Sequence, residues 1–136
     1  MNEKRAMFVG RWQPLHNGHK WLIGQKLDVG IPVLICVRDI QPDEKNPFTT
    51  EQTIDMLGIV YADEDVIIIP IPDIESVNYG RGVGYGIIEH MPPQDIGFIS
   101  ATQIRKQILE NNNAWKSNVD SKIHEKVISY LKEKEK

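Results

Sequence analysis

Two histidines three residues apart stand out in this sequence, within the stretch Gly10–Lys20, which reads GRWQPLHNGHK. His16 and His19 have a glycine between them, and a cation lies toward each end of the stretch, Arg11 before them and Lys20 after them. Two imidazoles can each donate a hydrogen bond to a phosphate oxygen, while an arginine adds a planar bidentate donor and a lysine adds a point charge. This combination predicts chemistry at a phosphate group.

Two other interpretations of the same histidines remain open. A zinc site needs at least a third protein ligand, and no Cys or Glu near His16 and His19 supplies one. The two residues could also be unrelated surface histidines in a loop. We favour phosphate chemistry over both, and we expect no metal ligands among the side chains of the protein.

A second stretch, Ile99–Lys106, carries related chemistry and reads ISATQIRK. Its residues Ser100, Thr102 and Arg105 fall in, or just after, the first turn of a predicted helix. The start of a helix offers unpaired backbone N–H groups and partial positive charge, which attract anions. We therefore predict a second anion site here, with a plain helix cap and a solvated arginine as the alternative.

Short apolar runs and helical patterns must position these two stretches. The runs do not alternate apolar with polar residues, which is typical of parallel strands covered on both faces; they lie at Ala6–Gly10, Pro32–Val37, Val66–Ile71 and Ile96–Ile99. Helical patterns cover Gly18–Asp28, a segment that Thr49 can cap with Gln52 as its capping-box partner, a segment that Ser100 can cap, and Asp120–Glu133. Parallel strands need helical crossovers, so this order predicts one α/β domain over residues 1–136 with a doubly wound parallel sheet, and with residues 130–136 as a frayed tail.

In this arrangement the histidine stretch becomes the first turn from a strand into a helix, at the carboxyl edge of the sheet. Open α/β sheets bind their ligands at that edge. Gly18 would stand at the start of the helix, where the absence of a side chain lets a ligand approach the backbone.

Composition excludes several classes of protein. The chain has 136 residues and a net charge of −3, so it is not a basic nucleic-acid binder. No apolar run reaches the ~18 residues that a membrane span needs, and the first residues contain too short an apolar segment for a signal peptide. We expect a cytoplasmic protein without nucleic-acid or membrane partners. The single cysteine, Cys36, excludes an internal disulfide framework and is predicted to be a buried thiol.

Together the two stretches resemble the signatures of a known superfamily. GRWQPLHNGH is similar to the G-R-F-Q-P-x-H-x-G-H signature of the HIGH-type nucleotidylyltransferases, the cytidylyltransferase-like superfamily, and ISATQIR is similar to its I-S-x-T-x-I-R signature. The segments KNPFTTEQTI (Lys45–Ile54) and IPIPD (Ile69–Asp73) resemble those of archaeal-type nicotinamide-mononucleotide adenylyltransferases. Class I aminoacyl-tRNA synthetases share the H-x-G-H turn, but they pair it with a K-M-S-K-S loop that this chain lacks.

The resemblance implies a Rossmann-like fold and a reaction in which an acceptor phosphate attacks the α-phosphate of a nucleoside triphosphate. It implies His16, His19 and Arg105 as catalytic residues that hold the triphosphate and stabilise the transition state. The residues implied to bind the nucleotide or its phosphates are Gly10, Arg11, Trp12, Gly18, Lys45, Ser100 and Thr102. It also implies Mg²⁺, bound mainly through the phosphates, and it leaves a homo-oligomer open because relatives often assemble as homo-oligomers.

The acceptor side matches less of the family pattern. Archaeal-type enzymes carry a tryptophan soon after I-P-x-P-D that stacks on the nicotinamide, whereas DIESVNYGRGVGY offers Asn78, Tyr79, Arg81 and Tyr85, which we expect to bind the acceptor. The stretch before ISATQIR is shorter than in that family, which predicts the loss of a strand. The glycine-rich part, Gly80–Gly86, does not fit the dinucleotide fingerprint and is predicted to be a loop, with a lid as one alternative.

These features predict a nucleotidylyltransferase that releases pyrophosphate, with ATP as the favoured donor and nicotinamide mononucleotide as the favoured acceptor. One alternative is a cytidylyltransferase that uses CTP and a small phosphorylated alcohol. The other is a nucleotide-binding module without turnover. His90 and His124 are predicted to be structural or solvated.

Overall fold

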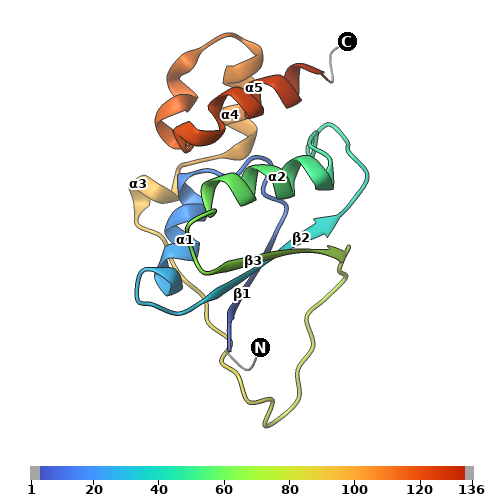
Figure 1. Cartoon of the computed structure of the whole chain (residues 1–136), viewed down its shortest axis with the longest axis vertical. Helices are drawn as coiled ribbons and strands as arrows, with labels where there is room; N and C mark the ends of the chain where they lie inside the picture. Colours follow the sequence, from blue (N-terminus) through green and yellow to red (C-terminus); the bar gives the residue numbers. More distant parts are fainter. Residues whose placement is uncertain (1–3, 134–136) are drawn as a thin grey trace.

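The computed structural model describes residues 4–133 and contains one three-stranded parallel sheet. The strands β1 (Ala6–Gly10), β2 (Val33–Asp39) and β3 (Val66–Pro72) lie in the order β1-β2-β3. Helix α1 (Asn17–Leu27) connects the first two strands, and α2 (Thr50–Val60) connects the second to the third. The parallel α/β architecture predicted from the sequence is confirmed (Figure 1).

The rest of the chain forms an irregular segment followed by a helical layer. Residues 73–93 contain no helix or strand, and they lead to α3 (Gln94–Gly97) and α4 (Ala101–Leu109). Two 3-10 turns, η1 (Asn113–Asn118) and η2 (Ser121–Ile123), then lead to α5 (His124–Glu133). In Figure 1, α4 and α5 lie beyond α2, and residues 73–93 extend from the opposite end of the molecule. No helix among the described residues is long and apolar enough to cross a membrane.

One face of the sheet carries the core. Phe8, Ile35 and Ile68 are aligned across the three strands, and α1 and α2 pack against the sheet over this face. With the strand order β1-β2-β3, two right-handed crossovers place both helices on the same side. Val33, Ile35 and Val37 are buried there with Met56 and Leu57 of α2. This layer fixes the carboxyl ends of β1 and β2, which carry the site.

The opposite face of the sheet, called the outer face below, consists of Met7 and Val9 of β1, Leu34 and Cys36 of β2, and Ile67 and Ile69 of β3. No helix of the described chain covers it, and Met7 is 57% exposed, Ile67 43% and Ile69 37%. Cys36 is a buried free thiol, as predicted. The prediction that both faces are covered therefore holds for only one of them.

The predicted fourth strand, Ile96–Ile99, is wrong. The structure places the short helix α3 over Gln94–Gly97 and packs it against α1. A run of four apolar residues does not distinguish a strand from a buried or half-buried helical turn. The predicted frayed tail is also shortened at its start, because α5 continues to Glu133; residues 134–136 lie outside the described part of the chain.

The predicted caps of α2 and α4 are present. The Thr49 hydroxyl accepts from the Gln52 backbone N–H at 3.0 Å, and the Gln52 amide oxygen accepts from the Thr49 backbone N–H at 2.9 Å, so the capping box is complete. The Ser100 hydroxyl accepts from the Gln103 backbone N–H at 3.3 Å. These caps set the helix starts on either side of the site.

Replacing Ile35 by Ala will lower the free energy of unfolding by about 2–5 kcal/mol, because the side chain is fully buried in the central strand. Val29→Ala is the control, since Val29 is 71% exposed in the turn after α1, and we expect a change below about 0.5 kcal/mol. Urea denaturation of both variants measures the two values. Equal losses would contradict the assignment of the core.

Candidate active site: a histidine pair joined to Arg105

The two histidines form the start of α1 and hold each other in place. His16 is the N-cap residue, and its Nδ1 accepts from the Gly18 backbone N–H at 3.1 Å. The Nδ1 of His19 accepts from the His16 backbone N–H at 3.2 Å, which completes a capping box made of two imidazoles. The rings stack with their centroids 3.8 Å apart and their planes 18° apart. The spacing H-x-G-H thus has a local structural cause as well as a chemical use.

This capping box decides which nitrogen of each imidazole carries the proton. Because both Nδ1 atoms accept hydrogen bonds from backbone N–H groups, a neutral ring must carry its proton on Nε2. Burial lowers the pKa of His16 to about 4, and burial together with the neighbouring His16 lowers the pKa of His19 to about 3. Neither Nε2 has a hydrogen-bond partner among the described residues. The histidine pair therefore presents two neutral N–H donors on stacked rings.

Gly18 is required by the imidazole of His16. A Cβ built on Gly18 would lie 2.8 Å from Cε1 of that ring, closer than side chains pack. From the sequence we predicted that this glycine lets a ligand approach the backbone. The structure shows that glycine is also needed in the absence of a ligand, because of the His16 ring. Gly10 has the same relation to Trp12, since a Cβ there would lie 2.9 Å from the indole ring.

Trp12 is buried and packs against His19. Its backbone adopts the left-handed region, with φ of 54°, and its side chain is almost fully buried. The indole Nε1 donates to the Cys36 backbone carbonyl at 3.1 Å, and the ring meets His19 edge to face at 4.9 Å. An indole in this position fixes the orientation of the imidazole of His19.

Arg105 lies against the same turn although 86 residues separate it from His19 in the chain. Its Nη1 donates to the Gln13 backbone carbonyl at 2.7 Å, and its Nη2 lies 3.5 Å from the Thr102 hydroxyl. The guanidinium is buried, and burial lowers the pKa of Arg105 while Asp43 opposes that shift. The structure thus brings the two predicted anion sites together.

Gln13 joins a third segment to the site. Its amide nitrogen donates to the Phe48 carbonyl at 3.2 Å, and its amide oxygen accepts from the Phe48 backbone N–H at 2.9 Å. This pair of bonds ties the loop before α2, which carries Lys45, to the histidine turn. Sequence reasoning did not single out Gln13, because both of its partner segments are distant in the chain.

The loop that carries Lys45 is shaped by Asp43. One oxygen of this carboxylate accepts from the backbone N–H groups of Lys45 and Asn46 and from the Asn46 side chain, at 2.8 to 3.0 Å. These hydrogen bonds, chiefly that of the Asn46 side chain, lower the pKa of Asp43, and nearby Arg11 contributes. Arg11 and Lys45 are both exposed, so their cations face solvent at the rim of the site.

A cleft of about 530 Å³ opens beside Arg105. It is lined by Thr102 and Arg105, by four residues of the loop before α2 and by two leucines, and the histidines do not line it; the loop residues are Pro42, Asp43, Glu44 and Pro47, and the leucines are Leu109 and Leu131. Arg105 therefore lines the cleft and also contacts the histidine turn through the Gln13 carbonyl. Among the described residues, no group of three or more His, Cys, Asp or Glu side chains lies close enough to hold a metal ion.

Three polar side chains in or near the predicted site have partners within the chain. Lys20 is paired with Asp120 at 2.7 Å, so its charge is used to join α1 to the turn η2. Ser100 caps α4, and its hydroxyl is engaged there. At the carboxyl ends of β2 and β3, Arg38 donates from Nε to Asp73 at 2.7 Å. We did not predict this pair from the sequence. An arginine that directly follows a buried apolar run could have indicated a polar contact at the carboxyl edge of the sheet.

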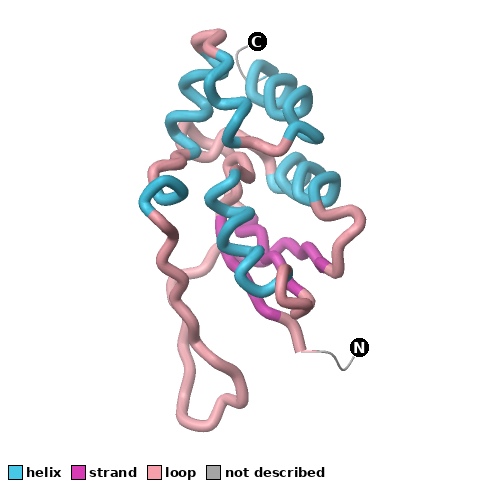
Figure 2. The backbone as a smooth tube through the Cα atoms, turned by 90° about the vertical axis from the view of Figure 1, so that its left-hand side faces the viewer, coloured by secondary structure: helices cyan, strands magenta, loops and turns pink. Residues whose placement is uncertain are grey.

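The four predicted acceptor residues do not lie at the histidine turn. Asn78, Tyr79, Arg81 and Tyr85 are all exposed on the irregular segment, and the Asn78 amide donates only to the nearby Ser76 hydroxyl. Gly82 and Gly84 in this segment have positive φ angles of 76° and 81°. Figure 2 shows the segment as a long loop that extends away from the helices.

Gln13→Leu will loosen the loop before α2, because leucine has a similar size but neither donates to nor accepts from Phe48. Leaving these buried backbone groups unpaired costs about 1–3 kcal/mol each. We expect faster hydrogen exchange at the Phe48 amide and faster proteolysis near Lys45. The control is Gln25→Leu, which removes a single hydrogen bond from the Gln25 side-chain amide to the Trp21 carbonyl in α1. It should leave both rates unchanged.

The free energy of unfolding will fall as the pH falls from about 6.5 toward 4. Below the ordinary pKa of histidine the unfolded chain binds protons at His16 and His19 that the folded protein does not bind, since both folded pKa values are lowered. At pH 5 the loss approaches about 2 kcal/mol for each imidazole. Urea denaturation between pH 5 and 7 measures it, and the double variant His16→Asn with His19→Asn should have the flatter profile. Parallel profiles would contradict two imidazoles that stay neutral in the folded protein.

Comparison with known proteins identifies relatives along most of the chain. A nicotinamide-nucleotide adenylyltransferase of Thermococcus onnurineus is 32% identical, over 90% of this chain and 81% of the relative. That of Sulfurisphaera tokodaii is 30% identical over 95% and 91%, and that of Thermococcus sibiricus is 28% identical over 95% and 83%. No family model matches the chain.

The alignments also show that the relatives are longer within the matched region. The alignment with the Thermococcus sibiricus protein runs over 162 positions, and this chain has 136 residues, so at least 26 positions have no counterpart here. A bifunctional NMN adenylyltransferase/ADP ribose pyrophosphatase from Francisella tularensis, complexed with AMP and a manganese ion, matches 52% of this chain and 23% of its own, with 31% identity and a TM-score of 0.46.

The similarity in sequence extends over both signature stretches and over four fifths or more of the relatives' length. The chain belongs to the nicotinamide-nucleotide adenylyltransferase family.

Proposed function

We propose that the protein transfers the adenylyl group of ATP to nicotinamide mononucleotide and releases pyrophosphate. One observation carries this proposal. The buried guanidinium of Arg105 contacts the turn that holds the two neutral imidazoles, through its 2.7 Å hydrogen bond to the Gln13 carbonyl. The names of the relatives support the choice of donor and acceptor.

In the proposed reaction an oxygen of the acceptor phosphate attacks the α-phosphorus of ATP, and the bond from that phosphorus to the bridging oxygen of the β-phosphate breaks. The attacking oxygen is already ionised, so no general base is needed. The transition state spreads negative charge over the oxygens of the α-phosphate and onto the leaving pyrophosphate. Catalysis of this kind rests on alignment and on donors fixed where charge develops.

His16 and His19 supply the donors at the α-phosphate. Their rings are stacked, and the capping box fixes them without any contribution from substrate. A donor that is oriented before the substrate binds costs no reorganisation at the moment of reaction. Trp12 keeps the His19 ring in this orientation.

Arg105 and Thr102 act at the leaving end of the triphosphate. Both line a cleft of about 530 Å³ that has room for a pyrophosphate group, and because Asp43 and Glu44 line it too, the guanidinium and Mg²⁺ would have to offset their charge. Arg11 and Lys45 neutralise charge from the rim of the site, and the free N–H groups at the start of α4 add partial positive charge. Gly10 and Gly18 contribute by the space that they leave for Trp12 and His16.

Mg²⁺ enters the proposed reaction as a part of the substrate, bound by the oxygens of the triphosphate. The described side chains form no cluster that would hold a divalent cation by themselves, and Mg²⁺ commonly keeps its waters and binds mainly through phosphates. Its charge would lower the repulsion between the acceptor phosphate and ATP.

One observation favours a second candidate, a nucleotide-binding module without turnover. The residues predicted to bind the acceptor, among them Tyr79 and Tyr85, are exposed and stand away from the histidine turn. The residues proposed to bind the nucleotide meet at one turn, and the residues predicted to bind the acceptor do not join them. Turnover, rather than nucleotide affinity, therefore separates the two candidates.

His19→Ala will lower the rate of pyrophosphate release from ATP and nicotinamide mononucleotide by about 10²–10³-fold, as the loss of a donor to a developing charge does. The affinity for ATP should fall by less than about tenfold, because the donor contributes mainly in the transition state. His124→Gln is the matched control, since His124 lies against Trp115 outside the site and should keep the wild-type rate.

The assay measures pyrophosphate release with Mg²⁺, with CTP as the alternative donor and a small phosphorylated alcohol as the alternative acceptor. Pyrophosphate release with CTP but not with ATP would show that CTP, rather than ATP, is the donor. A wild-type protein that binds ATP, releases no pyrophosphate with any of these pairs and loses affinity in His19→Ala would instead establish the binding module.

A further inference from the structure

Two apolar surfaces of this chain have no partner in the folded monomer. The first is the outer face of the sheet, where Met7, Ile67 and Ile69 are exposed. The second is the segment from Val77 to Phe98, defined here as the apolar segment. Of thirteen exposed large apolar side chains in the described residues, three lie on the outer face and eight on the apolar segment. Such a concentration marks an interaction site rather than ordinary surface.

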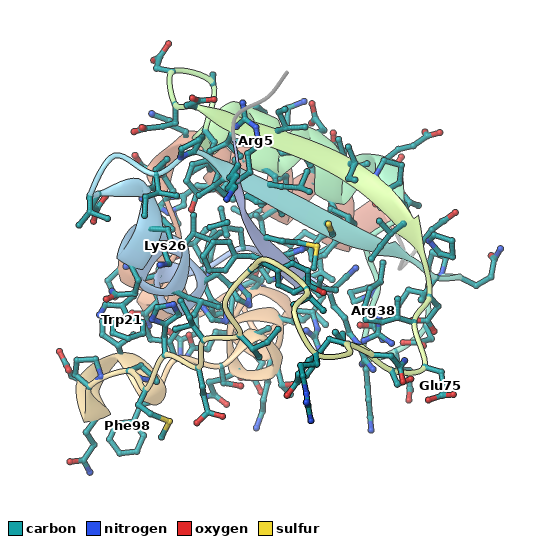
Figure 3. The ribbon with its side chains drawn as sticks, turned by 90° about the horizontal axis from the view of Figure 1, so that it is seen from below. Arg5, Trp21, Lys26, Arg38, Glu75 and Phe98 are labelled. Carbon is teal, nitrogen blue, oxygen red and sulfur yellow. The ribbon has the colours of Figure 1, made fainter. Side chains whose placement is uncertain are left out.

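The apolar segment carries its side chains into solvent along its length. Val77, Tyr85, Ile87, Ile88 and Met91 are each more than half exposed. In Figure 3 the segment runs below the sheet from Glu75 to Phe98, and the labelled Phe98 points outward. The segment is attached at the carboxyl end of β3 and at α3, and between these points it stands off its own sheet (Figure 2).

The exposed area of the chain is larger than a monomer of this size needs. Its solvent-accessible surface is 8886 Å², whereas a folded monomeric protein of 15.6 kDa exposes about 7,300 Å². The excess, about 1,600 Å², is twice the ~800 Å² that one partner contributes to a stable protein interface. The excess is large enough to include a protein interface, and the extended apolar segment contributes to it.

In this chain no helix covers the outer face of the sheet. The comparison agrees with this, because the alignment with the Thermococcus sibiricus protein contains at least 26 positions that this chain lacks. Two surfaces on one chain can cover each other when two copies meet, and a two-fold axis makes the exchange reciprocal. Each protomer then gives its apolar segment and receives that of its partner.

We propose that the outer face of the sheet binds the apolar segment of a second copy of this chain in a two-fold dimer, and that the segment delivered in this way completes the acceptor side of the partner's site. The second part rests on the proposed function. The outer face reaches Cys36, whose backbone carbonyl accepts from the Trp12 indole at 3.1 Å, so it is connected to the histidine turn through Trp12. Arg81 would supply a guanidinium for the acceptor phosphate, and Tyr79 and Tyr85 would supply aromatic rings for its base.

Analytical ultracentrifugation of the wild-type chain tests the interface without any use of activity. We expect a dimer of twice 15.6 kDa at micromolar concentration, and a monomer for Ile67→Glu, which places a charge on the outer face. Val29→Glu is the matched control, because Val29 is exposed outside both surfaces, and it should stay dimeric. A monomeric wild type, or a dimer that persists in Ile67→Glu, overturns the proposal.

Mixing two inactive variants tests the shared site. His19→Ala keeps its apolar segment intact, and Arg81→Ala keeps its histidine pair intact, so each mixed dimer has one complete site. After mixing and exchange of subunits, the rate of pyrophosphate release should rise to about a quarter of the wild-type value, because half of the dimers are mixed and half of their sites are complete.

A mixture no more active than its two components would overturn the delivery of the segment to the partner. An inactive wild type that is dimeric and becomes monomeric on Ile67→Glu would refute the proposed function and leave the interface standing. The two proposals therefore fail in different ways.

Discussion

The hydrogen bond from the Arg105 guanidinium to the Gln13 carbonyl is the contact on which the site depends. It joins a helix from the C-terminal layer to the turn between the first strand and the first helix, and the Gln13 side chain joins the loop before α2 to the same turn. Three segments that carry cations or donors thereby meet at one residue. All of these polar groups are buried, so each is costly to leave unpaired, and the arrangement tolerates little displacement.

The chemistry of the histidine pair follows from its place in the helix cap. A capping box is usually made by a hydroxyl and a carboxamide or carboxylate, and here two imidazoles take both roles. The backbone uses their Nδ1 atoms, burial keeps them neutral, and the remaining Nε2–H groups become oriented donors. A charged pair stacked at 3.8 Å would repel itself, whereas a neutral pair can be held ready for a polyanion.

Local patterns in the sequence were sufficient for the parts of the fold that local chemistry decides. The turn from β1 into α1, the cap at Thr49 and the cap at Ser100 could each be predicted, because the residues that make them are three or fewer apart. The run Ile96–Ile99 could not be assigned correctly, since four apolar residues fit a strand and a helical turn equally well. The role of Gln13 was invisible, because its partners lie 35 and 92 residues away.

For the acceptor-binding residues, the limit of prediction from the sequence is a different one. The residue types in the apolar segment suit a phosphorylated aromatic ligand, but up to residue 93 the segment is a loop without helix or strand, and most of its side chains are exposed. A sequence pattern identifies donors and rings, and it does not reveal whether their position is set by the same chain or by another one.

The most direct measurement of the central claim is a double-mutant cycle between His19→Ala and Arg105→Ala, read as the rate of pyrophosphate release from ATP. If both side chains act on one triphosphate, the double variant will lose much less than the product of the two single losses, because groups that stabilise the same transition state are strongly coupled. Single losses that multiply would contradict a shared site and separate the histidine pair from the guanidinium.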